Sequence, residues 1–179
     1  ALARVEDDHA TVWASTQNPF TLQREAAEAL GWTEERVRVI TPFVGGGFGG
    51  KTANQQALEA VRLSRLAGRP VQVFWTRKEE FFYDTFRPAT LVDVASGVDA
   101  DGRTAFWDYT NIGGGDRGAA PAYHLPNHRV VARGGWGGEG ARYHPLAVGA
   151  WRGPGANVNH FAMESQMDRM ARAAGTDPV

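Results

Sequence analysis

The sequence predicts an α+β fold in which mixed or antiparallel sheets pack against helices. Hydrophobic periodicity along the chain gives the element order β-α-β-α-β-β-β-β-α, without an internal repeat. The middle strands are joined by short turns. A doubly wound parallel sheet would instead need a crossover helix between consecutive strands.

In the first half, strands and helices alternate. The expected elements are a strand at 11–16, a helix at 20–30, a strand at 37–40, a helix at 57–67, a strand at 71–75 and a helix beginning in 76–80. Asn18-Pro19 ends the first strand, and Gly31 and Gly68 stand where the two long helices should stop. A polar connection at 33–36 links the first helix to the next strand.

The second half is richer in strands and in glycine. Its expected elements are strands at 90–96, 104–111 and 129–132 and a long helix at 157–174, and residues 148–152 run into Gly153-Pro154-Gly155. A hairpin-type turn fits 99–102, an ordered loop fits 112–126, and a glycine-rich turn fits 134–140. In the long helix, the residues near one face are Phe161, Met163, Met167, Met170 and Ala174.

The composition excludes several classes of protein. Of the 179 residues 42% are hydrophobic and 22% are charged, with a net charge of −1, which is enough for a core and gives no nucleic-acid footprint. There is no cysteine, so this chain has no disulfide and no iron–sulfur cluster of its own. The five histidines are scattered or separated by proline, so we expect no metal site built from them. No apolar run is long enough to span a membrane, and we expect no signal peptide.

A glycine loop, residues 45–50, follows the second strand and is followed by Lys51 and Thr52. These residues fit the phosphate-loop pattern G-x-x-x-x-G-K-[ST], which would make the chain a nucleotide-binding module with Lys51 on the phosphates and Thr52 on magnesium. Against this, Phe48 is bulky for a phosphate nest, and the only candidate acidic metal residue, Asp93, lies on a strand that alternates like an antiparallel one. A glycine turn without any ligand is a further alternative.

Five segments, in order, resemble the large, molybdopterin-binding subunit of the xanthine dehydrogenase and aldehyde oxidase family. They cover nearly the whole chain and are 13–19 (WASTQNP), 45–51 (GGGFGGK), 75–88 (WTRKEE…FRP), 149–155 (GAWRGPG) and 161–178. The amino-acid sequence of residues 71–109 resembles that of one branch of the family, the β-subunits of isoquinoline 1-oxidoreductases. The resemblance implies a partial molybdenum cofactor-binding domain over residues 1–179, and we expect both ends to be truncation boundaries.

The resemblance also implies an activity. Members of the family hydroxylate aldehydes or N-heterocycles with water as the oxygen source, and their electrons leave through iron–sulfur clusters on another domain or subunit, in some cases with a flavin subunit. The implied partners of the whole protein are therefore these subunits and a small-molecule substrate. The expected compartment is the cytoplasm, with the periplasm as the alternative.

The family's residue roles carry over to six positions that would bind the cofactor. Gln17 would donate a side-chain amide hydrogen bond to an oxygen on molybdenum, and an amide does this without adding charge. Gly46, Gly47 and Gly49 would approach the metal ligands through their backbone, Phe48 would wall the site, and Arg152 would lie beside the pterin or its phosphate. From the residues alone, Gln17 could instead bind local backbone, Phe48 could pack in the core, and Arg152 could form a surface ion pair.

Three further residues would line the substrate pocket. Arg87 aligns with an arginine that polarises the substrate in xanthine-oxidising members, although a solvated charge at a strand end would explain it equally. Thr52 stands where such members have glutamate, and Pro154 stands where they have a stacking phenylalanine, so a purine substrate is disfavoured. The family's glutamate base aligns beyond residue 179, and Glu164 aligns with nothing catalytic. We therefore expect no catalytic residue in this chain, and no molybdopterin on the chain alone. A non-catalytic interaction domain is the remaining alternative.

Overall fold

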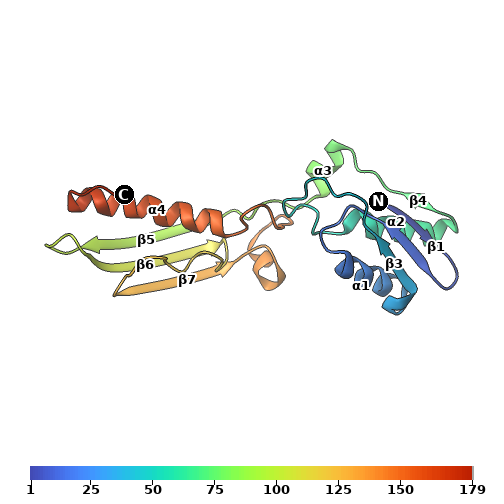
Figure 1. Cartoon of the computed structure of the whole chain (residues 1–179), viewed down its shortest axis with the longest axis horizontal. Helices are drawn as coiled ribbons and strands as arrows, with labels where there is room; N and C mark the ends of the chain where they lie inside the picture. Colours follow the sequence, from blue (N-terminus) through green and yellow to red (C-terminus); the bar gives the residue numbers. More distant parts are fainter. Residues whose placement is uncertain (179) are drawn as a thin grey trace. The chain divides into compact units, whose positions relative to one another are not determined.

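The computed structural model describes residues 1–178, which form two compact units, Ala1–Thr85 and residues 86–178 (Figure 1). Each unit has its own sheet and its own hydrophobic core. Sheets covered by helices confirm the predicted α+β class. No helix of residues 1–178 is both long enough and apolar enough to cross a membrane.

The N-terminal unit is a four-stranded sheet with two long helices. Its elements are β1 (Leu2–Val5), β2 (Ala10–Trp13), α1 (Pro19–Leu30), a 3₁₀ turn η1 (Glu34–Arg36), β3 (Val37–Ile40), α2 (Gln55–Ala67), β4 (Val71–Gln72) and α3 (Arg77–Tyr83). The strand order is β3-β2-β1-β4, in which β2 pairs parallel to β3 and β1 pairs antiparallel to both β2 and β4. The sheet is therefore mixed, as expected.

Small residues let α1 and α2 pack closely with the sheet of this unit. Fully or almost fully buried positions are Ala3, Val5, Ala10, Val12, Leu22, Ala26, Ala27, Val37, Ala57, Ala60 and Val61. Both long helices stop as predicted, because Gly31 and Gly68 take left-handed backbone angles that other residues adopt only with strain. The start of α3 at Thr76 is fixed by a capping box with Glu79.

The C-terminal unit is a three-stranded sheet with one long helix. Its elements are β5 (Leu91–Val98), β6 (Thr104–Gly113), β7 (His128–Gly134), a 3₁₀ segment η2 (Gly138–Tyr143) and α4 (Ala156–Ala174). The strand β6 pairs antiparallel to β5 and parallel to β7, and α4 lies along β5 (Figure 1). Met163 and Met170 point into the core, but Phe161 is 76% exposed, so its placement on the buried helix face was wrong.

Three strands differ from expectation. The strand β1 was not predicted, β4 is two residues long instead of five, and β2 spans Ala10–Trp13 instead of 11–16. Strand β2 ends at Trp13, and the chain from 14 to 18 is irregular. This irregular stretch carries Gln17 out of the sheet and toward the glycine loop.

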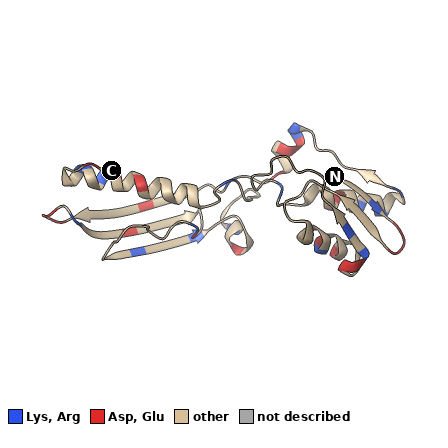
Figure 2. Ribbon diagram, viewed as in Figure 1, with Lys and Arg blue, Asp and Glu red and all other residues tan. Residues whose placement is uncertain are grey.

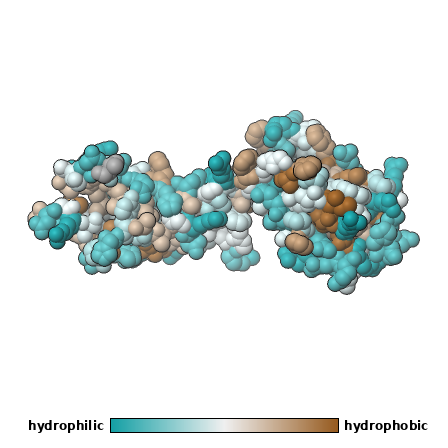
Figure 3. Space-filling model, in the orientation of Figure 1, coloured by the Kyte–Doolittle hydropathy of each residue, from teal (hydrophilic) through white to brown (hydrophobic). Residues whose placement is uncertain are grey.

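Charged residues of both signs occur in each unit (Figure 2). Figure 3 shows apolar residues, in brown, on the visible face of the N-terminal unit. The most exposed large apolar side chains of this unit are Phe20, Phe43, Leu66, Phe74, Phe81 and Phe82.

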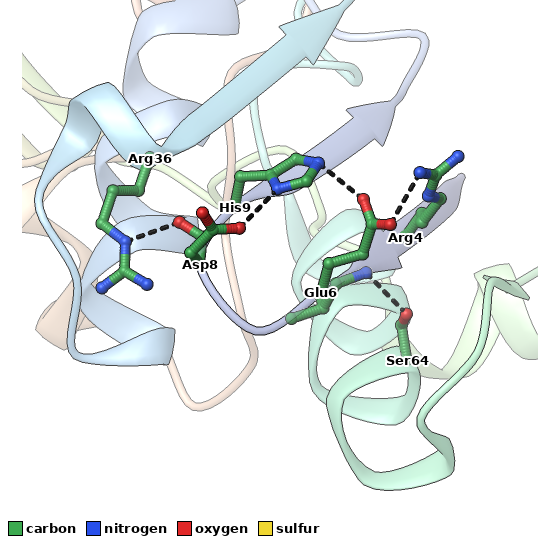
Figure 4. A network of polar contacts seen from close by, with 7 residues as sticks. Arg4, Glu6, Asp8, His9, Arg36 and Ser64 are labelled. Atoms are coloured by element: carbon green, nitrogen blue, oxygen red, sulfur yellow. Dashed lines mark hydrogen bonds and ion pairs between the residues drawn. The ribbon is translucent and has the colours of Figure 1, made fainter.

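A small ion network closes the β1–β2 turn (Figure 4). The His9 ring contacts Glu6 at 2.6 Å and Asp8 at 2.8 Å, and Glu6 also pairs with Arg4 at 2.7 Å. The hydrogen bond to Asp8 and the charge of Glu6 raise the pKa of His9 above its usual value. The charged form of this imidazole therefore stabilises the turn.

Candidate functional site

The glycine loop, residues 45–50, leaves β3 and folds over the irregular segment that follows β2. Gly50 N donates to Gly47 O at 2.9 Å, and Thr52 N donates to Gly49 O at 3.1 Å, so the loop ends in tight turns. The Thr52 hydroxyl also donates to Gly49 O, at 2.6 Å. Thr52 therefore has a structural partner inside the loop, and its predicted place in a substrate pocket stays a prediction.

Gln17 lies directly against this loop. Its Oε1 accepts hydrogen bonds from Gly49 N at 2.9 Å and from Lys51 N at 3.3 Å, and its backbone N donates to Lys51 O at 2.8 Å. These partners are more than thirty residues away in sequence, so the alternative in which Gln17 binds only local backbone is wrong. The structure places the predicted amide side chain and the predicted loop together.

The contacts of Gln17 fix which way its amide group faces. Both neighbours are N–H donors, so the atom facing them must be the carbonyl oxygen and not the NH₂ group. The Nε2 group then has no hydrogen-bond partner among residues 1–178. This side chain thus presents an uncharged N–H donor whose orientation is fixed by the two hydrogen bonds to its Oε1.

Gly47 leaves the space that the Gln17 side chain occupies. A Cβ atom at Gly47 would stand 2.4 Å from Gln17 Oε1 and 2.7 Å from its Cδ, closer than non-bonded atoms approach. Any larger residue would displace the amide. The glycine is therefore required by a close approach of side chain to backbone.

Phe48 has an uncommon conformation and an exposed ring. Its φ of 51° is the only positive φ among the described non-glycine residues, and such a backbone costs about 1 to 3 kcal/mol. The side chain is 60% exposed, so the alternative of simple core packing is wrong. A Cβ at Gly46 would lie 2.5 Å from this ring, which explains the glycine there.

The loop amides are not all open to a ligand. Those of Gly49 and Gly50 already donate within the chain, to Gln17 and to Gly47. The predicted approach of Gly46, Gly47 and Gly49 to the metal ligands stays a prediction, and in this structure the N–H of Gly49 donates to Gln17.

The phosphate-loop alternative does not match the geometry. In that motif the lysine and threonine open the following helix. Here α2 begins only at Gln55, and Lys51 Nζ donates back to Val44 O at 2.5 Å and to Ser15 Oγ at 2.9 Å. The mixed strand order β3-β2-β1-β4 is also not that of a parallel nucleotide-binding sheet.

The remaining predicted residues lie in the C-terminal unit, at the start of α4. Arg87 donates to Asn157 Oδ1 at 2.9 Å and to Arg152 O at 3.0 Å. Arg87 is therefore tied to the turn that carries Arg152 and Pro154, and the alternative of a purely solvated charge is wrong. The parts assigned to these three residues in cofactor and substrate binding stay predictions.

A buried polar network behind this turn was not predicted. Asn159 Oδ1 accepts from Tyr109 OH at 2.6 Å and from Asn111 Nδ2, while Asn159 Nδ2 donates to Gly115 O at 3.1 Å and Arg117 O at 3.0 Å. All three side chains are fully buried. Burial raises the pKa of Tyr109 to about 12. The network fixes the loop after β6 against the first turns of α4.

Glu164 and Tyr123 form no hydrogen bond with the residues described above. Glu164 accepts a hydrogen bond from Tyr123 OH at 2.5 Å on the surface of α4, and this bond raises the pKa of Tyr123. Within residues 1–178, His, Asp and Glu side chains form no group of three that could hold a metal ion.

Comparison with known proteins places this arrangement in a family. The family model described as "Molybdopterin cofactor-binding domain" matches residues 1–179. The chain belongs to this family. The predicted family and cofactor type are thereby confirmed, and the loop holding Gln17 is part of a domain that binds the molybdopterin cofactor.

Named relatives of this family resemble the chain over its whole length. It is 32% identical to a nicotinate dehydrogenase subunit of Pseudomonas putida KT2440, covering 100% of this chain and 16% of that protein. It is 35% identical to a putative xanthine dehydrogenase molybdenum-binding subunit of Escherichia coli K12, covering 100% of this chain and 25% of that protein. The β-subunit of isoquinoline 1-oxidoreductase of Brevundimonas diminuta is 29% identical over 97% of this chain and 24% of that protein. The chain thus spans a quarter or less of these relatives.

Solved structures confirm the fold. Quinoline 2-oxidoreductase from Pseudomonas putida 86 matches with a TM-score of 0.81 and 25% identity, over 99% of this chain and 24% of that chain. The aldehyde oxidoreductase of Desulfovibrio gigas matches with a TM-score of 0.78 and 24% identity, over 99% and 20%. The α+β architecture is therefore that of the corresponding part of molybdenum enzymes.

Proposed function

We propose that this chain is the cofactor-binding segment of a molybdenum hydroxylase that oxidises aldehydes or N-heterocycles with water as the oxygen source. The family match and the relatives' names, which include aldehyde, nicotinate and isoquinoline enzymes, support this class. When bound, the molybdenum cofactor supplies the oxygen transfer and the two-electron redox chemistry. The chain's own residues supply binding, orientation and hydrogen bonds.

The single observation that carries the proposal is the held amide of Gln17. Its Oε1 is occupied by two loop amides, so its Nε2 is left as a neutral, pre-oriented donor. Such a donor stabilises negative charge that develops during a reaction, because it needs no reorganisation when the charge appears. Gly47, which has no side chain to fill the space beside this amide, fits the same role.

Two departures from the family's sequence pattern narrow the class of substrate. Thr52 and Pro154 replace the glutamate and phenylalanine that xanthine-oxidising members use, so we propose an aldehyde or a small N-heterocycle in preference to a purine. We propose that an iron–sulfur subunit or domain, with or without a flavin subunit, accepts the electrons, since this chain has no cysteine to hold a cluster. A base from another part of the protein completes the site.

The test is to produce the whole protein with its partner subunits in a host that makes the molybdenum cofactor. We expect stoichiometric molybdenum and pterin, and incorporation of isotopically labelled water oxygen into an oxidised aldehyde or N-heterocycle. A whole protein that carries no molybdenum under these conditions would overturn the proposal and favour the non-catalytic interaction domain.

A further inference from the structure

Lys51, which the phosphate-loop pattern assigned to a nucleotide, donates two hydrogen bonds within its own unit. Its Nζ donates to Val44 O at 2.5 Å and to Ser15 Oγ at 2.9 Å. Val44 precedes the glycine loop, and Ser15 belongs to the irregular segment that carries Gln17. The ammonium therefore joins the entrance of the loop to that segment.

The backbone of Lys51 forms two hydrogen bonds with Gln17. Lys51 N donates to Gln17 Oε1 at 3.3 Å, and Lys51 O accepts from Gln17 N at 2.8 Å. Thr16, whose hydroxyl contacts Lys51 O at 3.4 Å, also donates to the buried Asn54 at 2.9 Å. Asn54 in turn donates to Glu25 on α1 at 2.9 Å. The contact between Lys51 and Gln17 is thus anchored in the core of the unit.

We propose that Lys51 is a positioning residue whose ammonium closes the glycine loop and thereby keeps the amide of Gln17 turned toward the cofactor. The part that concerns the cofactor rests on the proposed function. The loop closure itself does not. Lysine suits this task because a compact ammonium on a flexible stem can donate to two oxygens that converge on it.

The proposal is tested first by amide hydrogen exchange in the whole protein prepared without cofactor. Lys51→Met keeps the length of the stem and removes the ammonium. Charge-assisted hydrogen bonds are strong enough that we expect protection of the amides of residues 49–52 to fall about tenfold or more. Lys51→Arg, which retains a cation, should restore part of the protection. Lys78→Met is the matched control, because Lys78 is exposed on α3 and is the only other lysine in the chain.

The second measurement is the molybdenum content of the protein and the electron paramagnetic resonance signal of the metal. In the loaded protein, Lys51→Met should lower molybdenum content several-fold and change the electron paramagnetic resonance signal of the metal, while Lys78→Met leaves both unchanged. Ser15→Ala, which removes one partner of the ammonium at an exposed site, should give a smaller loss of protection and serves if Lys51→Met does not fold.

The outcomes separate the two proposals. Unchanged protection at 49–52 in both Lys51→Met and Ser15→Ala, or an equal loss in Lys78→Met, would overturn the loop closure. Normal molybdenum content and an unchanged signal in Lys51→Met would overturn its effect on the cofactor. A wild-type protein without molybdenum would overturn the proposed function, and the exchange result would still decide on the loop closure.

Discussion

In the N-terminal unit the glycine loop is bound by exposed or partly exposed side chains, whereas in the C-terminal unit the loop after β6 is bound by fully buried side chains. In the former, the partly exposed Lys51 and the exposed Gln17 bind backbone atoms of the loop above a core of small apolar residues. In the latter, the fully buried side chains of Asn111 and Asn159 donate to the loop carbonyl of Gly115, and the buried Tyr109 hydroxyl donates to Asn159 Oδ1. Hydrogen bonds made by exposed side chains can be removed with little effect on the fold, because water replaces the lost partner. Hydrogen bonds of a buried network cannot, because water does not reach the groups left without a partner.

The largest effect is expected from breaking the buried network. Asn159→Ala removes the side-chain partner of Tyr109 OH and of Arg117 O, and one of the two donors to Gly115 O, at a fully buried position. Each buried group left without a partner costs about 1 to 3 kcal/mol, so we expect the C-terminal unit to lose about 3 to 5 kcal/mol in its free energy of unfolding. Denaturant titration followed by amide exchange would assign the loss to this unit.

The matched control for this variant is Asn127→Ala. It removes the same side chain from an exposed site where it makes a single bond, to Ala105 O. We expect a loss of at most about 1 kcal/mol. Equal losses in the two variants would contradict the idea that burial sets the cost.

Gly47→Ala should weaken the hydrogen bonds between Gln17 and the amides of Gly49 and Lys51, with little effect on the free energy of unfolding. Its Cβ would stand 2.4 Å from Gln17 Oε1, and the exposed amide can move away. We expect less than about 1 kcal/mol of lost stability, together with increased amide exchange at Gly49 and Lys51. Gly137→Ala is the control, because nothing lies within 4 Å of its Cβ and its φ of −131° suits any residue. Unchanged exchange at Gly49 would show that the amide is not held as described.

High pH should weaken the C-terminal unit selectively. The pKa of Tyr109 is raised by burial to about 12, above the value near 10 of a free tyrosine. Its contribution to stability is therefore fully present below the unfolded value and is lost as pH rises through the folded one. Tyr109→Phe should remove this dependence between pH values of about 10 and 12. A wild-type unit equally stable across that range would be inconsistent with a buried phenol.

The smallest effect is expected at the β1–β2 turn. The hydrogen bond to Asp8 raises the pKa of His9, so protonated His9 stabilises the turn below the usual histidine range, and this contribution is lost as pH rises through the raised value. The half-exposed ring makes the effect small. Magnetic resonance titration of the ring should show the raised pKa, and Asp8→Asn should lower it. No change in Asp8→Asn would refute the assigned cause.

The long helices and central strands could be predicted because their signals are local. The stops at Gly31 and Gly68 and the alternation in β6 need no information from elsewhere in the chain. Strand β1 was missed because Val5 is its only β-branched residue, whereas the equally short β3 has three. Strand β4 is short because only Leu2 and Ala3 of β1 pair with it. Phe161 was misplaced because it is about 200° around the helix from Met163, at two residues' distance.

The candidate site was predictable only in part, since its contacts join distant residues. The closeness of Gln17 to the loop followed from the family resemblance, not from spacing. The local pattern around Lys51 indicated a phosphate, whereas its partners Ser15 and Val44 become visible only after folding. The pairing of Tyr109 with Asn159 spans 50 residues, although a polar side chain at an inward position of β6 is a signal that could have indicated it.

The central claim, that Gln17 serves as a held donor, is tested most directly by the turnover number per bound molybdenum in Gln17→Glu. Glutamate keeps an oxygen for the amides of Gly49 and Lys51 and replaces the donor by a second acceptor. We predict normal molybdenum content with a rate lowered on the order of a hundredfold, as when one pre-oriented donor is removed from an active site. A variant that turns over at the wild-type rate per molybdenum would contradict the account.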